Sequence, residues 1–213
     1  MNHENAFIIT TSSGEGLGQL FLELGADALI PLGDTGCPTE DDFLAAIRSS
    51  GSRSILVMPN DEAALLTAER AVLGLDFVRV LPTRSFCEGY VALASMPRGE
   101  SIDTLYSLAL GAISSFVAIE IACQSRGTME ERYSATSGGE RYSPSASAEA
   151  ALFESVERLI CPHHRIITLI VGKGVTNSRR VFVTERLGEL YPDSEIIVYI
   201  GGQTATEYYI ALR

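Results

Sequence analysis

The first stretch with the residue types and spacing of a ligand-binding motif is a glycine-rich loop near the N-terminus. Gly14, Gly16 and Gly18 follow an apolar run that begins at Phe7, and they precede a helical pattern of leucines. Backbone N–H groups at such a helix start can hold a phosphate group. A dinucleotide-binding loop has the spacing GxGxxG, whereas this loop reads GxGxG, and Glu15 within it would repel phosphate. We therefore favour a tight strand-to-helix turn, with contact to a ligand or partner as the alternative.

Two further groups of residues could hold an anion or a metal ion. Lys173 lies between two glycines after an apolar run, but the Gly-Lys-Ser/Thr ending of a P-loop is absent, so we expect a solvated loop lysine. His163 and His164 follow Cys161 closely. Neighbouring side chains on an extended chain point in opposite directions, and no second ligand pair lies nearby in the sequence. We expect these histidines in a surface turn.

Candidate nucleophiles occur only without the frame that would activate them. Ser12, Ser13, Ser85 and Cys37 all lie in loops that follow predicted strands. No GxSxG or Ser-x-x-Lys motif surrounds them. The acidic pairs 41–42 and 130–131 are more typical of solvated charges than of a general acid and base. The sequence therefore does not predict an autonomous hydrolase.

Charge and composition restrict the class of protein further. The 213 residues carry a net charge of −11, and the isoelectric point is near 4.7. This charge argues against binding to nucleic acid or to an anionic membrane surface, because both need clustered Lys and Arg. No apolar run is long enough to cross a bilayer, no N-terminal signal precedes Phe7, and the four cysteines form no CxxC pair. We expect a cytoplasmic protein with no membrane insertion.

The first half of the chain predicts a four-stranded parallel sheet with helices on both faces. Short apolar runs bounded by Gly or Pro alternate with amphipathic segments, as in α/β folds. The predicted strands begin at Phe7 and cover 28–32, 54–58 and 77–81; the predicted helices cover 15–24, 40–49, 61–73 and a segment around Tyr90. Thr39 with Asp42 and then Asn60 are the expected helix caps. Pro97 breaks the pattern, so we predict lobes at 1–96 and 97–213.

The second half predicts an α/β lobe with a mixed sheet. Predicted helices cover 101–113, 147–160 and 174–191, and predicted strands cover 116–122, 165–171, 195–200 and 208–212. The last two strands are too close in sequence for a parallel crossover, so part of the sheet must be antiparallel. The polar stretch 124–147 is either a linker or a small hairpin that turns at Gly138-Gly139. We favour the hairpin.

A series of short motifs runs through nearly the whole chain in a fixed order. They are Gly14-Glu15-Gly16, Pro38-Thr39-Glu40-Asp41, Met58-Pro59-Asn60, Leu81-Pro82-Thr83-Arg84-Ser85, Glu88-Gly89, 172–175, 190–195 and Gly201-Gly202-Gln203 before Tyr208-Tyr209. Together they resemble the C-terminal part of the bacterial fatty acid kinase ATP-binding subunit, in the DAK2 domain-containing protein family. No single motif is specific, but the ordered series is.

The resemblance implies a two-lobed DegV-like fold and a role beside a kinase. In that family ATP and Mg²⁺ belong to a separate N-terminal domain, so the resemblance implies no cofactor in this chain. It also implies two partners: the ATP-binding kinase domain and a fatty-acid-carrying DegV-like protein, whose acyl carboxylate the kinase phosphorylates. The expected function is docking of that carrier without catalysis by this domain.

Two departures from the family pattern bear on ligand binding. The loop 33–41 is shorter than the family's Gly-Gly-Gln-Thr-Met-Asn-Pro version, and 59–62 reads Pro-Asn-Asp-Glu where fatty-acid carriers have a serine- and glycine-rich loop. An acyl carboxylate would meet acidic residues there. We therefore expect that this domain does not carry a fatty acid, and keep a small-molecule or fatty-acid binding protein as the alternative.

Polar residues and glycines at the predicted strand ends form the expected ligand or partner rim. Because the carboxyl ends of parallel strands meet at one edge of a sheet, these loops should converge. Asp34 lies at an offset suited to a ribose, so a nucleotide-dependent enzyme remains a third hypothesis. The rim comprises Ser12, Ser13, Gly14, Gly16, Thr35, Asn60, Thr83, Arg84, Ser85, Gly201, Gly202 and Gln203. No catalytic or metal-ligating residue is predicted.

Overall fold

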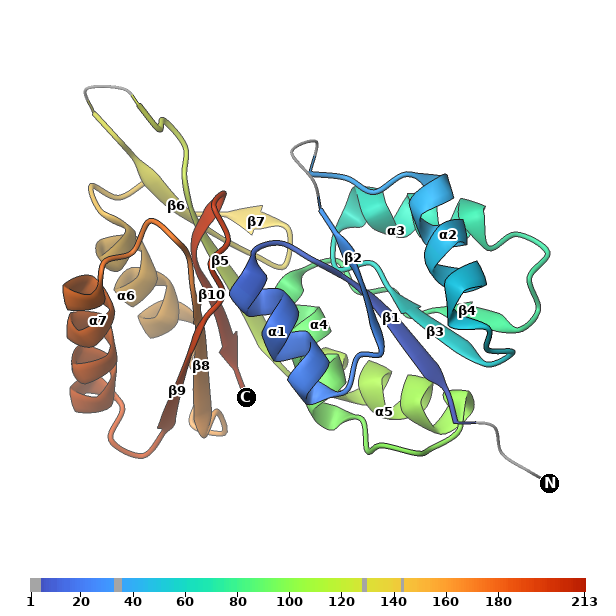
Figure 1. Cartoon of the computed structure of the whole chain (residues 1–213). Helices are drawn as coiled ribbons and strands as arrows, with labels where there is room; N and C mark the ends of the chain where they lie inside the picture. Colours follow the sequence, from blue (N-terminus) through green and yellow to red (C-terminus); the bar gives the residue numbers. More distant parts are fainter. Residues whose placement is uncertain (1–4, 33–35, 128–129, 143) are drawn as a thin grey trace. The chain divides into compact units, whose positions relative to one another are not determined.

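A computed structural model describes residues 5–32, 36–127, 130–142 and 144–213. The chain divides into two compact units, Met1–Ser115 and Phe116–Arg213, each with its own sheet (Figure 1). Helix α5 (Ile102–Ser114) packs against α4 (Phe86–Ser95) within the first unit. The sequence predicts lobes at 1–96 and 97–213, and that boundary stays a prediction.

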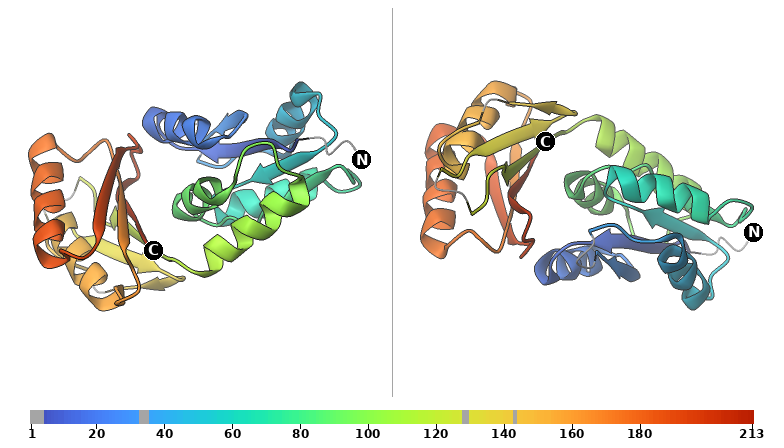
Figure 2. Two further views of the ribbon diagram at one scale, coloured as in Figure 1. Left: turned by 90° about the horizontal axis from the view of Figure 1, so that it is seen from below. Right: turned by 90° about the horizontal axis from the view of Figure 1, so that it is seen from above.

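The first unit is a four-stranded parallel sheet in the order β2-β1-β3-β4, as the sequence predicts. Its remaining elements are β1 (Phe7–Ser12), α1 (Glu15–Leu24), β2 (Ala28–Pro31), α2 (Glu40–Ser50), β3 (Ile55–Met58), α3 (Glu62–Ala71) and β4 (Val78–Val80). Helices α2 and α3 pack together and bury Ile9, Ile55 and Val57 of the sheet. Helices α1 and α4 pair on the opposite face of the sheet (Figure 2). The Phe21 and Phe86 rings of these helices lie 6.4 Å apart in a tilted arrangement. Central strands are therefore apolar at consecutive positions.

Helix starts in this unit follow local capping chemistry, with one correction. The predicted capping box is confirmed: the Asp42 N–H donates to Thr39 Oγ1 at 3.3 Å, and the Thr39 N–H donates to the Asp42 carboxylate at 2.8 Å. The prediction that Asn60 caps α3 is wrong. The cap is Asp61, which accepts from the Ala64 N–H at 2.9 Å. Asn60 instead has a left-handed backbone, with φ of 56°, and its side chain enters the protein interior.

The second unit is a six-stranded mixed sheet in the order β7-β6-β5-β10-β8-β9. Its elements are β5 (Val117–Cys123), β6 (Tyr133–Ser137), β7 (Glu140–Arg141), α6 (Ala148–Leu159), β8 (Ile166–Val171), α7 (Asn177–Leu190), β9 (Glu195–Ile200) and β10 (Thr206–Leu212). Among the described strands of this unit, only β8 and β9 pair in parallel, and α7 connects them. Residues of α6 and α7 share one core with the sheet. The predicted hairpin is confirmed, with Gly138 and Gly139 at φ of 58° and 81°.

The chain crosses the end of β8 to bring β10 between β5 and β8. The crossing segment carries Gly201 and Gln203, and the Lys173 N–H donates to the Gln203 carbonyl at 2.8 Å. Gln203 is 1% exposed, and its amide nitrogen Nε2 donates to the Ile170 carbonyl at 3.1 Å. A Cβ on Gly172 would lie 2.1 Å from the Thr206 carbonyl oxygen. Glycine at 172 therefore permits the close crossing.

The turn before β8 differs from the surface turn predicted from the sequence. His164 is only 4% exposed, and its Nδ1 accepts from the Cys161 N–H at 3.0 Å. Burial lowers the pKa of His164, and the neighbouring His163 lowers it further. The two rings lie 4.4 Å apart, so adjacent side chains here do not point in opposite directions. The prediction assumed an extended backbone at these histidines. The backbone instead turns here, with the His164 N–H donating to the Cys161 carbonyl at 2.9 Å.

The close approach at Gly172 predicts a large, position-specific effect on stability. Gly172→Ala should lower the free energy of unfolding by about 3 kcal/mol, because the added methyl group meets backbone rather than a movable side chain. Gly188→Ala in α7 is the matched control, since no atom lies within 4 Å of its Cβ position. The control should be neutral or stabilising by up to ~1 kcal/mol. Urea unfolding of both variants measures the difference; equal stabilities would contradict the crossing geometry.

Candidate functional site

A cluster of buried polar side chains joins three strand ends in the first unit. We call Thr10, Thr11, Asn60 and Thr83 the strand-end cluster; each is at most 1% exposed. Asn60 Nδ2 donates to Thr10 Oγ1 at 2.7 Å and to the Thr11 carbonyl at 2.9 Å. The Asn60 N–H donates to Thr83 Oγ1 at 3.0 Å, and Thr11 Oγ1 donates to the Pro59 carbonyl. The hydroxyl groups of Thr10, Thr11 and Thr83 are thus hydrogen-bonded to other groups of the protein.

Asn60 fits this cluster because α4 has a glycine beside it. A Cβ on Gly89 would lie 2.3 Å from Asn60 Oδ1, so only glycine leaves room for the amide. Among the described residues, Oδ1 has no hydrogen-bond donor. The left-handed backbone of Asn60 is one that asparagine tolerates better than most residues. Asn60, which the sequence analysis placed on the rim, is therefore buried after β3, where it bonds to β1 and packs against α4.

The glycine-rich loop leaves the start of α1 without a side-chain cap. Gly14 is the N-cap residue, with φ of 87°, and no side chain accepts a hydrogen bond from the first turn. Ser12 is 6% exposed and its Oγ lies against Gly18, whereas Ser13 and Gly16 are partly exposed. Uncapped N–H groups at a helix start favour an anion. Glu15 in the same turn is exposed and opposes one.

The predicted rim residues after β4 form a helix cap. Ser85 accepts from the Glu88 N–H at 3.1 Å, and the Glu88 carboxylate accepts from the Arg84 N–H. Burial raises the pKa of Glu88, although the Arg84 N–H and charge act in the opposite direction. The Arg84 side chain is exposed. Thr35 lies outside the described residues, and Gly201, Gly202 and Gln203 lie at the strand crossing in the second unit.

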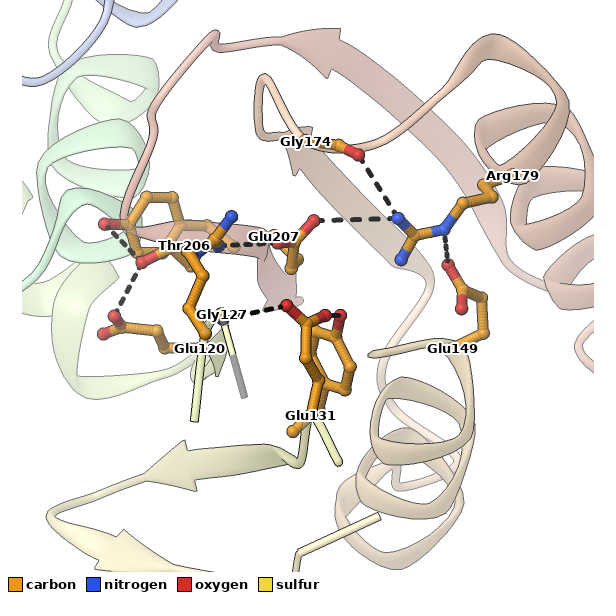
Figure 3. A network of polar contacts seen from close by, with 11 residues as sticks. Glu120, Gly127, Glu131, Glu149, Gly174, Arg179, Thr206 and Glu207 are labelled. Carbon is orange, nitrogen blue, oxygen red and sulfur yellow. Dashed lines mark hydrogen bonds and ion pairs between the residues drawn. The ribbon is translucent and has the colours of Figure 1, made fainter. Parts of the chain in front are cut away.

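The second unit contains a network of charged side chains that the sequence analysis did not predict (Figure 3). We define the glutamate–arginine network as Arg126, Glu149, Arg179, Glu207 and Tyr208. Arg126 donates to Glu207 Oε1 at 2.8 Å, and Arg179 Nη1 lies 3.9 Å from Glu207 Oε2. Arg179 Nε and the Tyr208 hydroxyl both donate to Glu149 Oε1, at 2.6 and 2.9 Å. Arg126 of the turn after β5 and Arg179 of α7 therefore both approach the Glu207 carboxylate.

Glu207 is the most deeply buried charge in this network. It is 4% exposed, whereas the side chains of Arg126 and Arg179 are 52% and 32% exposed. The pairing of β10 with β5 shifts register between Thr206 and Tyr208. At this irregularity the side chains of Thr206 and Glu207 both have polar partners. Thr206 Oγ1 donates to Glu120 at 2.9 Å, and Glu207 meets the arginines. A buried carboxylate needs such compensation, since an unpaired one would be strongly destabilising.

An open pocket of about 600 Å³ lies beside the network. Arg179 and Glu149 contribute to its wall, as do Glu130, Glu131 and Tyr133. The Tyr133 hydroxyl donates to Glu131 at 2.7 Å; this bond, with a second from the Gly127 N–H, lowers the pKa of Glu131. The same hydrogen bond raises the pKa of Tyr133 to about 12. The pocket wall is therefore charged and hydrogen-bonded at neutral pH.

These ionisation states suit recognition better than proton transfer. Burial opposes ionisation of Glu149, but hydrogen bonds from Arg179, its own backbone and Tyr208 outweigh burial and lower the pKa. Burial and Glu149 raise the pKa of Tyr208. A general base or acid works best with a pKa near the working pH, and these shifts move away from neutrality. The pocket wall offers fixed charges to a polar or basic partner.

The network could not be predicted because its members come from four separate segments between residues 126 and 208. One sequence signal existed: Glu207 is the only charge in strand β10, whose other residues are Thr206 followed by aromatic and apolar side chains. A charge in a central strand implies a partner charge, although it does not say which one. Arg179, in the first turn of α7, carries no comparable signal.

The described part of the chain contains no cluster of three or more His, Cys, Asp or Glu side chains suited to a metal ion. Within the same ranges, none of the helices combines the length and apolar character that a membrane span requires.

Comparison with known proteins identifies the family. Residues 7–213 match the FakA-like C-terminal family, which is the C-terminal part of FakA-like fatty acid kinase proteins. The chain belongs to this family. An uncharacterized protein of Staphylococcus aureus strain USA300 is 24% identical over 222 residues, which cover 97% of this chain and 39% of that protein. This member of the FakA-like family thus spans about two fifths of that curated relative.

Solved structures show that the family member has the DegV fold predicted from its motifs. A DegV family protein of Corynebacterium glutamicum superposes with a TM-score of 0.69 at 13% identity, covering 100% of this chain and 98% of that one. The Streptococcus pneumoniae fatty acid kinase B3 protein, solved loaded with linoleic acid, superposes with a TM-score of 0.65 at 9% identity, covering 99% of both chains. At these identities the similarity concerns the fold.

The lowered pKa of Glu149 predicts a pH-dependent contribution to stability. At neutral pH Glu149→Gln should lower the free energy of unfolding by about 2 kcal/mol, because Arg179 loses a charged partner. Ionised Glu149 stabilises the fold at every pH above the ordinary pKa of glutamate. This stabilisation is lost as the pH falls through the lowered pKa that Glu149 has in the folded protein. Wild type and variant should therefore converge below pH ~4. Urea unfolding between pH 7 and 3 measures this convergence.

The exposed Glu157 on the same helix provides the control for that experiment. Glu157→Gln should change stability by less than about 0.5 kcal/mol throughout the pH range. If Glu149→Gln and Glu157→Gln behave alike, the Glu149–Arg179 pair does not contribute as described.

Proposed function

We propose that this chain is a non-catalytic domain of a fatty acid kinase, which docks the DegV-like fatty-acid-carrying subunit. Acyl phosphate formation would occur on a separate ATP-binding domain that holds ATP and Mg²⁺. The observation that carries the proposal is the family match across residues 7–213, which includes both units. The function of the whole kinase is an inference here, since the chain spans 39% of its S. aureus relative.

The strand-end cluster supports docking in preference to carrying a fatty acid. A carrier needs hydroxyl or amide groups that can turn toward an acyl carboxylate. Here Thr10 and Thr83 already bond to Asn60, and the amide of Asn60 fills the space beside Gly89. Releasing these groups to a ligand would break buried hydrogen bonds, at a cost of about 1 to 3 kcal/mol for each group left unsatisfied.

The pocket beside the glutamate–arginine network supports a specific docking surface. Its carboxylates Glu130 and Glu131 are exposed, with Arg132 of the same wall 3.4 Å from Glu130, while Glu149 is held in the wall by Arg179. Fixed carboxylates recognise Lys or Arg side chains and accelerate association through long-range attraction. The net charge of −11 adds to that attraction. We therefore propose that the carrier presents a basic segment to this pocket.

Charge reversal at the pocket tests the docking proposal. The variant with both Glu130→Lys and Glu131→Lys should weaken binding of the fatty-acid-carrying subunit by at least about tenfold, mainly by slowing association. Both residues are exposed, so the core should stay folded, although Glu131→Lys removes the hydrogen bonds from Tyr133 and the Gly127 N–H. Urea unfolding of the variant checks that it remains folded. Titration calorimetry and surface plasmon resonance with the organism's own carrier measure affinity and rate. The chain should be joined to its kinase domain if the natural protein contains one.

The control reverses an equally exposed charge in the first unit. Glu69→Lys lies on the outer side of α3 and should leave the affinity within about twofold of wild type. If both changes weaken binding equally, the carrier responds to the overall charge of this chain and not to the pocket. If a properly folded wild-type protein binds no carrier, the docking function itself is wrong.

Fatty-acid binding is the second candidate, favoured by one observation. The uncapped start of α1 presents N–H groups that could bind a carboxylate, and the similar S. pneumoniae protein was solved with linoleic acid. Native mass spectrometry after incubation with oleate should then detect one added fatty acid per chain. Glu15→Gln should strengthen that binding by removing a repelling charge. Absence of added mass in both proteins would eliminate this candidate.

A further inference from the structure

The four outer strands of the two sheets differ in how they are protected against pairing with another chain. Strand β7 has two residues, both charged and exposed. Strand β2 has four residues and ends in Pro31, and β4 has three with Arg79 at its centre. Strand β9 has six residues, Glu-Ile-Ile-Val-Tyr-Ile, with one charge at its start and no register shift against β8. Short length, charge and proline are the usual devices against strand pairing, and β9 lacks them.

The backbone of β9 exposes alternate hydrogen-bonding groups at this edge. The Glu195 N–H donates to Arg165 at 2.8 Å and the Gly201 N–H donates to Val171 at 2.9 Å, both toward β8. By the alternation of a parallel ladder, Ile197 and Tyr199 also direct their N–H and C=O groups toward β8. Ile196, Val198 and Ile200 therefore direct theirs outward, and no partner for them occurs in the ranges that the structure describes.

The side chains at these three outward positions are all β-branched and apolar. Ile196 and Val198 are partly buried against the core that α6 and α7 cover. Ile200 is 62% exposed. β-branched residues favour strand pairing, and covering an isoleucine this exposed would add hydrophobic stabilisation. The edge is therefore suited to a further strand.

We propose that β9 pairs with β9 of a second copy of this chain, antiparallel about a two-fold axis through Val198. In this register Ile196 lies opposite Ile200 of the second copy, and Val198 lies opposite its own equivalent. Each of these is a hydrogen-bonded pair, so all three outward residues exchange both backbone bonds. No other two-fold register pairs all three of them with one another. The two sheets then form one continuous sheet across the axis.

Charge supports a second copy as the occupant. In this register Glu195 lies opposite Gly201 of the second copy, so no carboxylates face each other. An open groove of about 330 Å³ lies between Val198 and α7, with Arg180 and Glu185 on its wall. The two-fold axis reverses α7 of the second copy, which brings Arg180 of each copy toward Glu185 of the other. The same operation would cover Val181, which is 42% exposed. Closed two-fold symmetry also prevents further growth.

Sedimentation velocity over a wide range of protein concentration tests this proposal. The chain should form a dimer and nothing larger. Ile200→Lys should weaken the dimer by at least about tenfold, since it places a charge in the pairing surface. Val198→Pro should act similarly, because it removes an outward N–H without removing a bond to β8. Leu73→Lys is the matched control: Leu73 is 79% exposed in the first unit, and the change should have less than about twofold effect.

Amide hydrogen exchange followed by NMR tests the register separately from the assembly. Protection of Ile196, Val198 and Ile200 should increase with protein concentration, whereas Ile197 and Tyr199 should be protected at every concentration by β8. In Ile200→Lys the concentration dependence should disappear while the protection of Ile197 remains. This second readout separates loss of pairing from loss of the fold.

Three results would overturn the proposal. The first is a monomer at millimolar concentration and 0.15 M salt, where repulsion between the acidic chains is screened. The second is a dimer that Ile200→Lys and Val198→Pro leave unchanged. The third is protection of the outward amides only when a fatty-acid-carrying protein is added, which would make this edge a site for that partner.

Discussion

The second unit depends on neutralising one carboxylate in its central strand. Glu207 lies in β10, which is flanked by β5 and β8, and is 4% exposed. A charge so placed cannot remain unpaired, so Arg126 and Arg179 must approach it. Arg179 in turn holds Glu149 at the start of α6. Through Arg179, this buried charge is linked to the starts of both α6 and α7 beside the pocket.

In the first unit the buried polar side chain that joins separate segments is neutral: it is the amide of Asn60. The Asn60 amide ties the ends of β1 to the loop after β3, and Thr83 fixes the loop after β4. Gly89 leaves the space that this amide needs. In both units a buried polar side chain is held by partners from other segments of the chain: Asn60 by hydrogen bonds and Glu207 by ion pairs.

Two kinds of surface result from this architecture. The pocket beside the glutamate–arginine network offers fixed charges, which act on association and partner choice. The β9 edge offers backbone groups and apolar side chains, which act through direct pairing. The two differ in salt dependence: high salt should weaken contacts at the pocket, and it should favour association at the edge by screening the net charge of −11.

The sequence by itself determined those features that depend on neighbouring residues. The capping box at Thr39 and Asp42, the hairpin at Gly138-Gly139 and the order of strands and helices follow from local propensity and periodicity. Motif order also led to the correct family and fold. Only the tertiary structure decided what distant residues do: Asn60 turns inward without capping α3, His164 is buried, and Glu207 meets two arginines. These outcomes depend on which segments lie side by side. For the glycine-rich loop from Gly14, the sequence predicts a turn and a helix start with free N–H groups, and the structure adds that no side chain caps that helix start.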